Sequence, residues 1–592
     1  MRTSLKGLFV ALVAVAALSL PLTAATQTVE DAVSTFTYTQ KMKPQGYSPR
    51  VVPLTGAGSG IYNSDLAFWG KTAYQGSYTG FRIIDVSDPE NPVELNNYEE
   101  CSPGTTQGNQ GDVIVWDNLL VRSWNSPATA TSSCDGELVG LGFEGLHVFD
   151  ISNPSDPDLV GSVGLDGLPF LVTVNSGSAA GSYEATGANW GTPVPQGGLS
   201  GTVDAVNDGV VAPGGGTVTD GCEPFSVPAG SIALVDRGLC GFVVKAANAQ
   251  AAGASAIIVA NNVPGLPITM GGADPAVTIS GVMVSQADGA TIRAGGLPVG
   301  ASITHNPELG CGSHTATGVP DLANDRLLVY NSSSAGGTCD FFEIVEVPLD
   351  DPASARVVNV VDSMHTCHDI GVILGDAMRL ACAGGTGARI FSLDPADGAS
   401  LTNPVLMHHF DIPGVTIGHS AGWSWDGEVL IFGHEPGGGA QARCQATSAE
   451  VDRTIFFYDH EGNQLGTFLH PRPQTATENC TWHNYNVVPT DKGRFLVAGN
   501  YQSGISVLDF TDPANVREIA FADPAPLINP DNPAAIEGGG DWSSYWYDGR
   551  IYESDMTRGL LIWNLVDPAV AGAKKLGHLN PQTQEMTIQL KG

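Results

Sequence analysis

The chain has 592 residues, and its 61 acidic side chains outnumber the 26 basic ones, so the formal net charge at pH 7 is −35. A field of this sign repels nucleic acid and anionic lipid, which disfavours both as partners. Only 15% of the residues are charged, whereas 74 are glycine. Low charge, abundant glycine and many short apolar runs favour an all-β protein rich in tight turns.

The N-terminus has the layout of a secretory signal peptide. Arg2 and Lys6 precede an uncharged apolar run over residues 7–20, and small residues follow at Ala24 and Ala25. We therefore expect residues 1–25 to be removed and the mature protein to be secreted, periplasmic or extracellular. The run is short for a membrane anchor, and no later stretch reaches the ~18 apolar residues of a membrane span.

A ten-residue phrase recurs along the chain. Each copy reads as a short apolar strand that ends at an Asp-Pro or Asn-Pro turn, over residues 80–89, 145–154, 504–513 and 559–568. Repeats spaced at about 40–50 residues are typical of propellers and solenoids. Aligning the chain on this phrase gives seven units of three or four short strands. The sequence therefore predicts a seven-bladed β-propeller.

The recurring phrase resembles the repeat of the LVIVD family of propeller-like proteins. The resemblance covers most of residues 60–163 and 307–570, and it is good in units one, two, six and seven. Units three to five depart from it, with different sequences at residues 343–348, 388–392 and 454–458. The resemblance implies a propeller fold and leaves the blade boundaries in these three units open.

Between units two and three the repeat stops for about 140 residues. A buried strand at residues 231–236 is followed by a small-residue helix that ends at Gly253, and then by buried strands at 254–260 and 278–285. With its Asp236-Arg-Gly turn and its strand leading to Ser285, this stretch resembles the protease-associated (PA) domain. The resemblance implies an inserted α/β module that binds partners or covers a neighbouring site without catalysing a reaction.

We expect the following division of the chain: signal peptide 1–25, a first propeller segment 26–163 (blades one and two), PA domain 164–306, a second propeller segment 307–580 (blades three to seven) and C-terminal tail 581–592. The ten cysteines of an exported chain favour disulfides. Sequence alone does not prove their connectivity. Because repeats contact mainly their neighbours, local closure is favoured, which gives five neighbouring pairs: Cys101 with Cys134, Cys222 with Cys240, Cys311 with Cys339, Cys367 with Cys382, and Cys444 with Cys480.

One motif matches a catalytic pattern, but its flanking sequence does not fit the strand–turn–helix that the chemistry requires. Residues 418–422 fit the G-x-S-x-G pattern of a nucleophile elbow, with Ser420 at its centre. That elbow requires a strand, a strained turn and then a helix. The residues that follow continue as a strand and a hairpin, so we expect Ser420 to be an ordinary strand residue.

The internal alignment places a histidine or an aspartate at the start of the first strand of every unit. The innermost strands of a propeller line its channel, so these side chains could converge on the axis and bind zinc, copper or iron. A polar ring that hydrogen-bonds backbone between blades is the alternative, and Asp369 or His365 could replace the histidine of unit four. The candidate ligands are Asp65, Asp112, His314, His368, His419, His483 and Asp541.

Two functions follow from these features. The first is an exported, non-catalytic binding or scaffold protein whose propeller and PA domain recognise a protein or a glycan. The alternative is a metal-dependent oxidoreductase, with a divalent transition metal held by the His/Asp ring. No peptidase or hydrolase domain is recognised, and the HExxH pattern of zinc peptidases is absent from the sequence.

Overall fold

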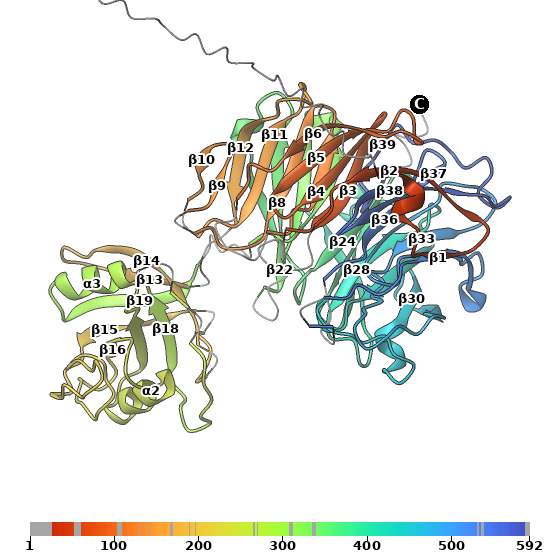
Figure 1. The fold of residues 1–592 in the computed structure, drawn as a ribbon. Coiled ribbons are helices and arrows are strands. Elements are labelled where there is room, and N and C mark those ends of the chain that lie inside the picture. The colour runs from red at the N-terminus through yellow and green to blue at the C-terminus, as the bar shows by residue number, and fades with distance from the viewer. Residues whose placement is uncertain are drawn as a thin grey trace, which may run out of the picture.

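The computed structural model describes residues 27–585 except 53–60, 103–108, 130, 141, 166, 167, 169, 189, 196, 265, 266, 269, 307–311, 334–338, 530, 531 and 534–537. The expected signal peptide lies outside these residues. No helix in the described stretches of the chain is long and apolar enough to cross a membrane. The described strands form a propeller-like body, and a smaller domain stands beside it (Figure 1).

The first sheet shows how the recurring phrase folds. Its antiparallel strands are β3 (Asn63–Trp69), β4 (Thr72–Ser77), β5 (Gly80–Asp85) and β6 (Val93–Tyr98). The phrase forms the third strand, β5, and Asp85 ends it by accepting a hydrogen bond from the backbone N–H of Ser87 at 2.8 Å. Asp150 and Asp509 end their own strands in the same way. Because a short Asp side chain satisfies the turn locally, the phrase is a strand-and-turn unit.

The same antiparallel order recurs in further sheets. The second repeat contains β7 (Val113–Trp116), β8 (Leu119–Trp124), β11 (Gly145–Asp150) and β12 (Asp158–Gly164), with a small pair, β9 (Ser133–Cys134) and β10 (Glu137–Leu138). Three sheets follow the smaller domain. The first contains β20 (Thr315–Asp321), β21 (Arg326–Ser332), β22 (Phe341–Pro348) and β23 (Arg356–Asp362), and the second contains β24 (Asp369–Leu374), β25 (Arg379–Gly384), β26 (Gly387–Ser392) and β27 (Val405–Asp411). The third contains β28 (Gly418–Trp423), β29 (Val429–His434), β30 (Thr454–Asp459) and β31 (Gln464–Leu469).

The last repeats share one larger sheet. It contains β32 (Asn484–Val487), β33 (Phe495–Gly499), β34 (Ile505–Asp509), β35 (Arg517–Asp523), β36 (Asp541–Tyr547), β37 (Arg550–Asp555) and β38 (Gly559–Leu565), and it is joined by a single pairing of β32 with β36. Short helices lie at turns and near the N-terminus: α1 (Val29–Ala32) and the 3-10 turns Leu322–Asn324, Pro352–Ser354, Pro395–Asp397, Glu450–Arg453 and Pro513–Asn515.

The two ends of the described chain close the propeller-like body. Near the N-terminus, β1 (Thr37–Tyr38) pairs with β35 and β2 (Met42–Pro49) pairs with β38, so strands from opposite ends complete the last sheet. Near the C-terminus, β39 (His578–Leu579) pairs with β3 and β40 (Thr583–Glu585) pairs with β24. Residues 583–585 were expected to lie in a tail, yet they cover an inner sheet edge that would otherwise expose unpaired backbone groups.

The first strands of the sheets are neighbours in a closed order. Starting from β3, each one contacts the next, and the last contacts β3 again, in the order β3, β7, β20, β24, β28, β32 and β36. Apolar side chains fill the space between adjacent sheets. Phe68 of the first sheet, for example, stacks on Tyr547 of the last at a ring-centroid distance of 4.5 Å. This packing fixes the starts of the inner strands around one axis.

The smaller domain is a closed barrel with two helices. Its strands are β13 (Phe170–Val174), β14 (Gly181–Thr186), β15 (Leu199–Ala205), β16 (Ile232–Asp236), β17 (Ala256–Ala260), β18 (Ser280–Val284) and β19 (Val299–His305), and its helices are α2 (Phe242–Ala251) and α3 (Gln286–Ala294). Gly253 follows α2 with φ +88°, a left-handed conformation that suits glycine after a helix. The N–H of Gly312 donates to Leu165 O at 2.5 Å, so the chain leaves and re-enters the propeller-like body at one place.

Four disulfides lie in the described residues. Each joins cysteines that are neighbours along the chain: Cys101–Cys134, Cys222–Cys240, Cys367–Cys382 and Cys444–Cys480. Cys311, the expected partner of Cys339, lies outside the described residues. Cys101–Cys134 therefore joins the first repeat to the second, Cys222–Cys240 lies within the barrel, and the other two disulfides each lie within one repeat.

Candidate metal centre in the propeller channel

Four imidazoles lie in a row at the inner strands. Neighbouring ring centroids are 4.5 Å apart from His314 to His368, 4.2 Å from His368 to His419 and 4.2 Å from His419 to His483. Three of the residues directly precede β20, β24 and β32, and His419 is the second residue of β28. Because these inner strands are neighbours, histidines that are about 50–65 positions apart along the chain meet in space.

A carboxylate that the sequence did not single out lies against this row. Glu435 directly follows β29, the second strand of its sheet. Its two oxygens lie 3.9 Å from His419 Nε2 and 4.0 Å from His483 Nε2. Ligand atoms of His368, His419 and Glu435 all lie within 4.8 Å of one another. These three side chains are close enough to share one metal ion.

Backbone carbonyls orient two of the imidazoles. His419 Nδ1 lies 3.1 Å from His483 O, and His483 Nδ1 lies 2.6 Å from Trp542 O. When Nδ1 donates its proton to such a carbonyl, Nε2 carries the free lone pair that a metal needs. In both residues Nε2 is the atom nearest Glu435.

Burial determines the charge state of the site. It lowers the pKa of His314 to about 4 and that of His483 to about 3. The pKa values of His368 and His419 also lie well below the usual range, first through burial and then through the neighbouring imidazoles. Burial raises the pKa of Glu435 to about 7. At neutral pH the row is therefore a set of uncharged imidazoles, the protonation state that binds metal ions.

The row opens on a cavity of about 210 Å³. All four histidines and Glu435 line it, together with Tyr501 and Trp542. The Tyr501 hydroxyl donates to Glu435 Oε1 at 2.8 Å. Tyr501 has φ +47°, an uncommon value for a residue other than glycine, and two backbone hydrogen bonds of 2.8 Å to Asp541 hold it there. Backbone strain of this kind is concentrated at functional sites.

The three candidate aspartates have other partners. Asp65 accepts hydrogen bonds from the Tyr545 hydroxyl at 2.6 Å and from the Gln582 amide at 3.0 Å. Asp112 accepts from the backbone N–H of Ala316 at 2.7 Å, and burial and then the charge of Asp65 raise its pKa. The carboxylate beside the imidazoles is therefore Glu435, whereas Asp65 and Asp112 form a separate buried pair.

Several of the first strands begin irregularly. The register shifts between Asn63 and Leu66, between Gly418 and Ala421, and between Asp541 and Ser543, so strands that carry a candidate aspartate and a strand that carries His419 all begin with a bulge. A bulge re-aims the side chains next to it. The Asp541 carboxylate accepts a hydrogen bond from the Ser544 hydroxyl at 2.7 Å. Asp541 holds Tyr501 in place through its backbone N–H and carbonyl, not through its side chain.

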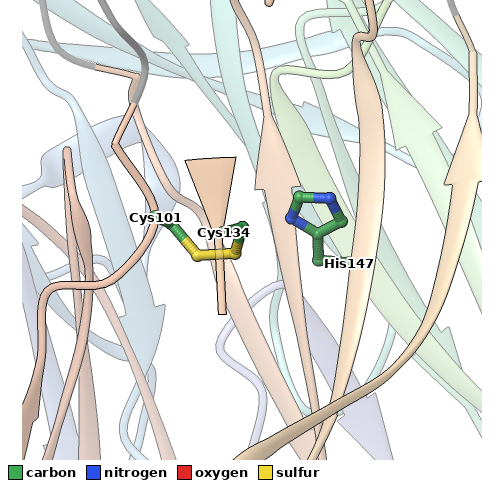
Figure 2. A group of neighbouring side chains, drawn as sticks. All are labelled: Cys101, Cys134 and His147. Atoms are coloured by element: carbon green, nitrogen blue, oxygen red, sulfur yellow. A yellow bond between two sulfur atoms is a disulfide. The ribbon is translucent and has the colours of Figure 1, made fainter. Parts of the chain in front are cut away.

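Three other features that could suggest a functional site lack the ligands of this row. Figure 2 shows His147 beside Cys101 and Cys134, whose sulfurs are joined in a disulfide and are therefore not thiolate ligands. Ser420 lies within β28, and its hydroxyl donates to Trp482 O at 3.3 Å. A larger cavity of about 910 Å³, lined among others by Lys71 and Tyr547, contains no histidine among its described lining residues.

Two kinds of family module match stretches of the chain. The LVIVD repeat matches residues 62–100 and 139–164, and the PA domain matches residues 204–292. The chain carries LVIVD repeats and a PA domain. The first repeat match spans strands β3 to β6 of the first sheet, the second spans β11 and β12 of the second sheet, and the PA match lies within the barrel.

Comparisons with individual proteins cover shorter or more distant stretches. Aminopeptidases from two strains of Pseudomonas aeruginosa are 54% identical over 50 residues, which is 8% of this chain and 9% of each relative. A zinc aminopeptidase from Bacillus subtilis is 20% identical over 29% of this chain and 35% of its own, with a TM-score of 0.17. The Dos1 propeller covers 88% of this chain and 95% of its own at 9% identity, with a TM-score of 0.39. The chain thus spans about a tenth of the curated aminopeptidases.

Proposed function

We propose that this protein is an exported, metal-dependent oxidoreductase whose metal is held by His368, His419 and Glu435 in the propeller channel. The observation that carries this proposal is the grouping of their ligand atoms within 4.8 Å in a buried site. Two imidazoles and one carboxylate with open positions are the ligand set of non-haem iron oxygenases, and imidazoles also suit copper. Either metal would supply one-electron chemistry when bound.

The neighbouring residues support such a site. Tyr501 binds only one Glu435 oxygen, Oε1, while Oε2 faces His419. His314 and His483 extend the row on either side, so further imidazoles stand next to the three ligands. The cavity of about 210 Å³ leaves room for a small substrate beside the metal. Burial disfavours the ionised form of the Glu435 carboxyl. A bound metal cation would stabilise this ionised form by its positive charge.

We propose a second role for the inserted domain. We interpret the closed order of first strands as seven blades, with β1 and β2 completing the last two of them. The PA domain then stands on the propeller as a module for binding another protein, which is the element of the binding or scaffold hypothesis that we retain. Four local disulfides suit a protein that works outside the cytosol.

Metal analysis of the untagged mature protein tests the proposal. We expect one equivalent of iron or copper per chain, and its loss in His419→Ala and Glu435→Ala. His409→Ala is the matched control, because His409 is exposed on β27. Equal metal content in all four proteins, or no metal in any, would refute the centre and leave the scaffold function. Zinc at the same residues would retain the site and refute its redox role.

A further inference from the structure

A second cavity of about 210 Å³ adjoins the metal cavity. The two cavities share the lining residues Gln110, Gly438, Tyr501 and Trp542. Of the described residues that line the second cavity, none carries a formal charge. The space beside the metal cavity on this side is therefore uncharged.

Aromatic rings line the way from this second cavity to the imidazoles. Tyr62 meets Tyr78 edge to face at 5.5 Å, and Tyr78 meets Trp542 edge to face at 6.1 Å. Trp542 in turn contacts His483 at 4.7 Å. Met556 packs in the same apolar cluster. Ring centroids 4.5–7 Å apart in edge-to-face geometry are the favourable arrangement for aromatic pairs, so a further ring would find matching partners here.

A run of three glycines keeps this space open. Gly437, Gly438 and Gly439 all have positive φ, at +76°, +58° and +68°. Gly438 lines both cavities. A Cβ atom on Gly439 would lie 2.9 Å from Glu435 Oε1 and 2.9 Å from the Tyr501 hydroxyl, closer than such contacts normally come. The loop therefore approaches the Glu435–Tyr501 pair more closely than a residue with a side chain could.

We propose that the second cavity, beside the metal cavity, binds a small, uncharged, monocyclic aromatic molecule of about the size of phenol. Its ring would lie against Tyr78, Trp542 and Met556, and its polar substituent would face the imidazole row. A cavity of about 150 Å³ already accommodates a benzene ring. Moving an ion into this uncharged space would cost its hydration without compensation. This inference rests on the proposed function, because it places the polar end of the ligand beside the metal ligands.

Calorimetric titration with phenol tests the inference on the full mature chain, once metal-free and once metal-loaded. We expect both forms to bind phenol, and the metal-free form to bind benzoate and cyclohexanol at least tenfold more weakly. Tyr78→Leu and Met556→Ala should each weaken phenol binding about tenfold. Tyr38→Leu and Met407→Ala are matched controls, because both residues are exposed, 39% and 46%, and neither lines the cavities. Circular dichroism identifies any variant that fails to fold, and the other variant then decides.

The outcomes separate this inference from the proposed function. Metal bound at the histidines without phenol binding would overturn the inference alone. Phenol bound by the metal-free chain, with no metal ever retained, would overturn the oxidoreductase proposal and support the aromatic cavity. Equal binding of phenol, benzoate and cyclohexanol, or equal binding by the cavity variants and their controls, would contradict the aromatic specificity.

Discussion

Replacing Glu435 with Gln should change how the stability of the metal-free protein depends on pH. Burial raises the pKa of this carboxyl from 4.5 to about 7. Between these values the folded protein keeps a proton that the unfolded chain has released, so the free energy of unfolding falls as the pH rises. A pKa difference of about 2.5, at ~1.4 kcal/mol for each pKa unit, corresponds to about 3.5 kcal/mol over the full titration, of which about 3 kcal/mol falls between pH 4.5 and pH 8. Gln is uncharged, and its oxygen can still accept from Tyr501, so the variant should not lose this stability.

Urea unfolding in EDTA, followed by tryptophan fluorescence at pH 4.5 and pH 8, measures this effect. The free energy of unfolding of Glu435→Gln relative to wild type should increase by about 3 kcal/mol between the two pH values. The buried imidazoles, whose pKa values are lowered, contribute the opposite slope below about pH 6.5 in both proteins, so the comparison isolates Glu435. Glu461→Gln, at an exposed carboxyl, is the control. Parallel pH profiles for Glu435→Gln and wild type would refute the reasoning.

Three further predictions concern the rest of the chain. Because Gly312 bonds to Leu165, replacing residues 166–311 with a short Gly/Ser linker should leave a soluble protein with a β-type circular dichroism spectrum, and aggregation would contradict the insertion. Replacing both Cys367 and Cys382 with Ala should lower the free energy of unfolding by about 3 kcal/mol, since the disulfide closes a 15-residue separation; an unchanged urea midpoint would be the contrary result. Ser420→Ala should retain any activity, and fluorophosphonates should not label Ser420.

Much of the fold could be predicted because its signals are local. The recurring phrase contains its own strand and its own stop, as the bond from Ser87 to Asp85 shows. Gly253 likewise marks the end of helix α2 through its left-handed backbone. The pairing of strands from the two ends of the chain with distant strands could not be predicted in this way. The pairing of β2 with β38 joins residues more than 500 positions apart, and β40 enters an inner sheet edge from what looked like a tail.

The candidate site shows the same division. The sequence alone determined that histidines recur at the starts of the inner strands, and a repeated fold then places His314, His368, His419 and His483 in one row. Only the tertiary structure decided which carboxylate joins them. Glu435 directly follows a second strand, a position outside the aligned first strands, whereas Asp65 and Asp541 accept hydrogen bonds from Tyr545 and Ser544. Repetition in sequence encodes strand order, but side-chain direction depends on local register, which one extra residue reverses.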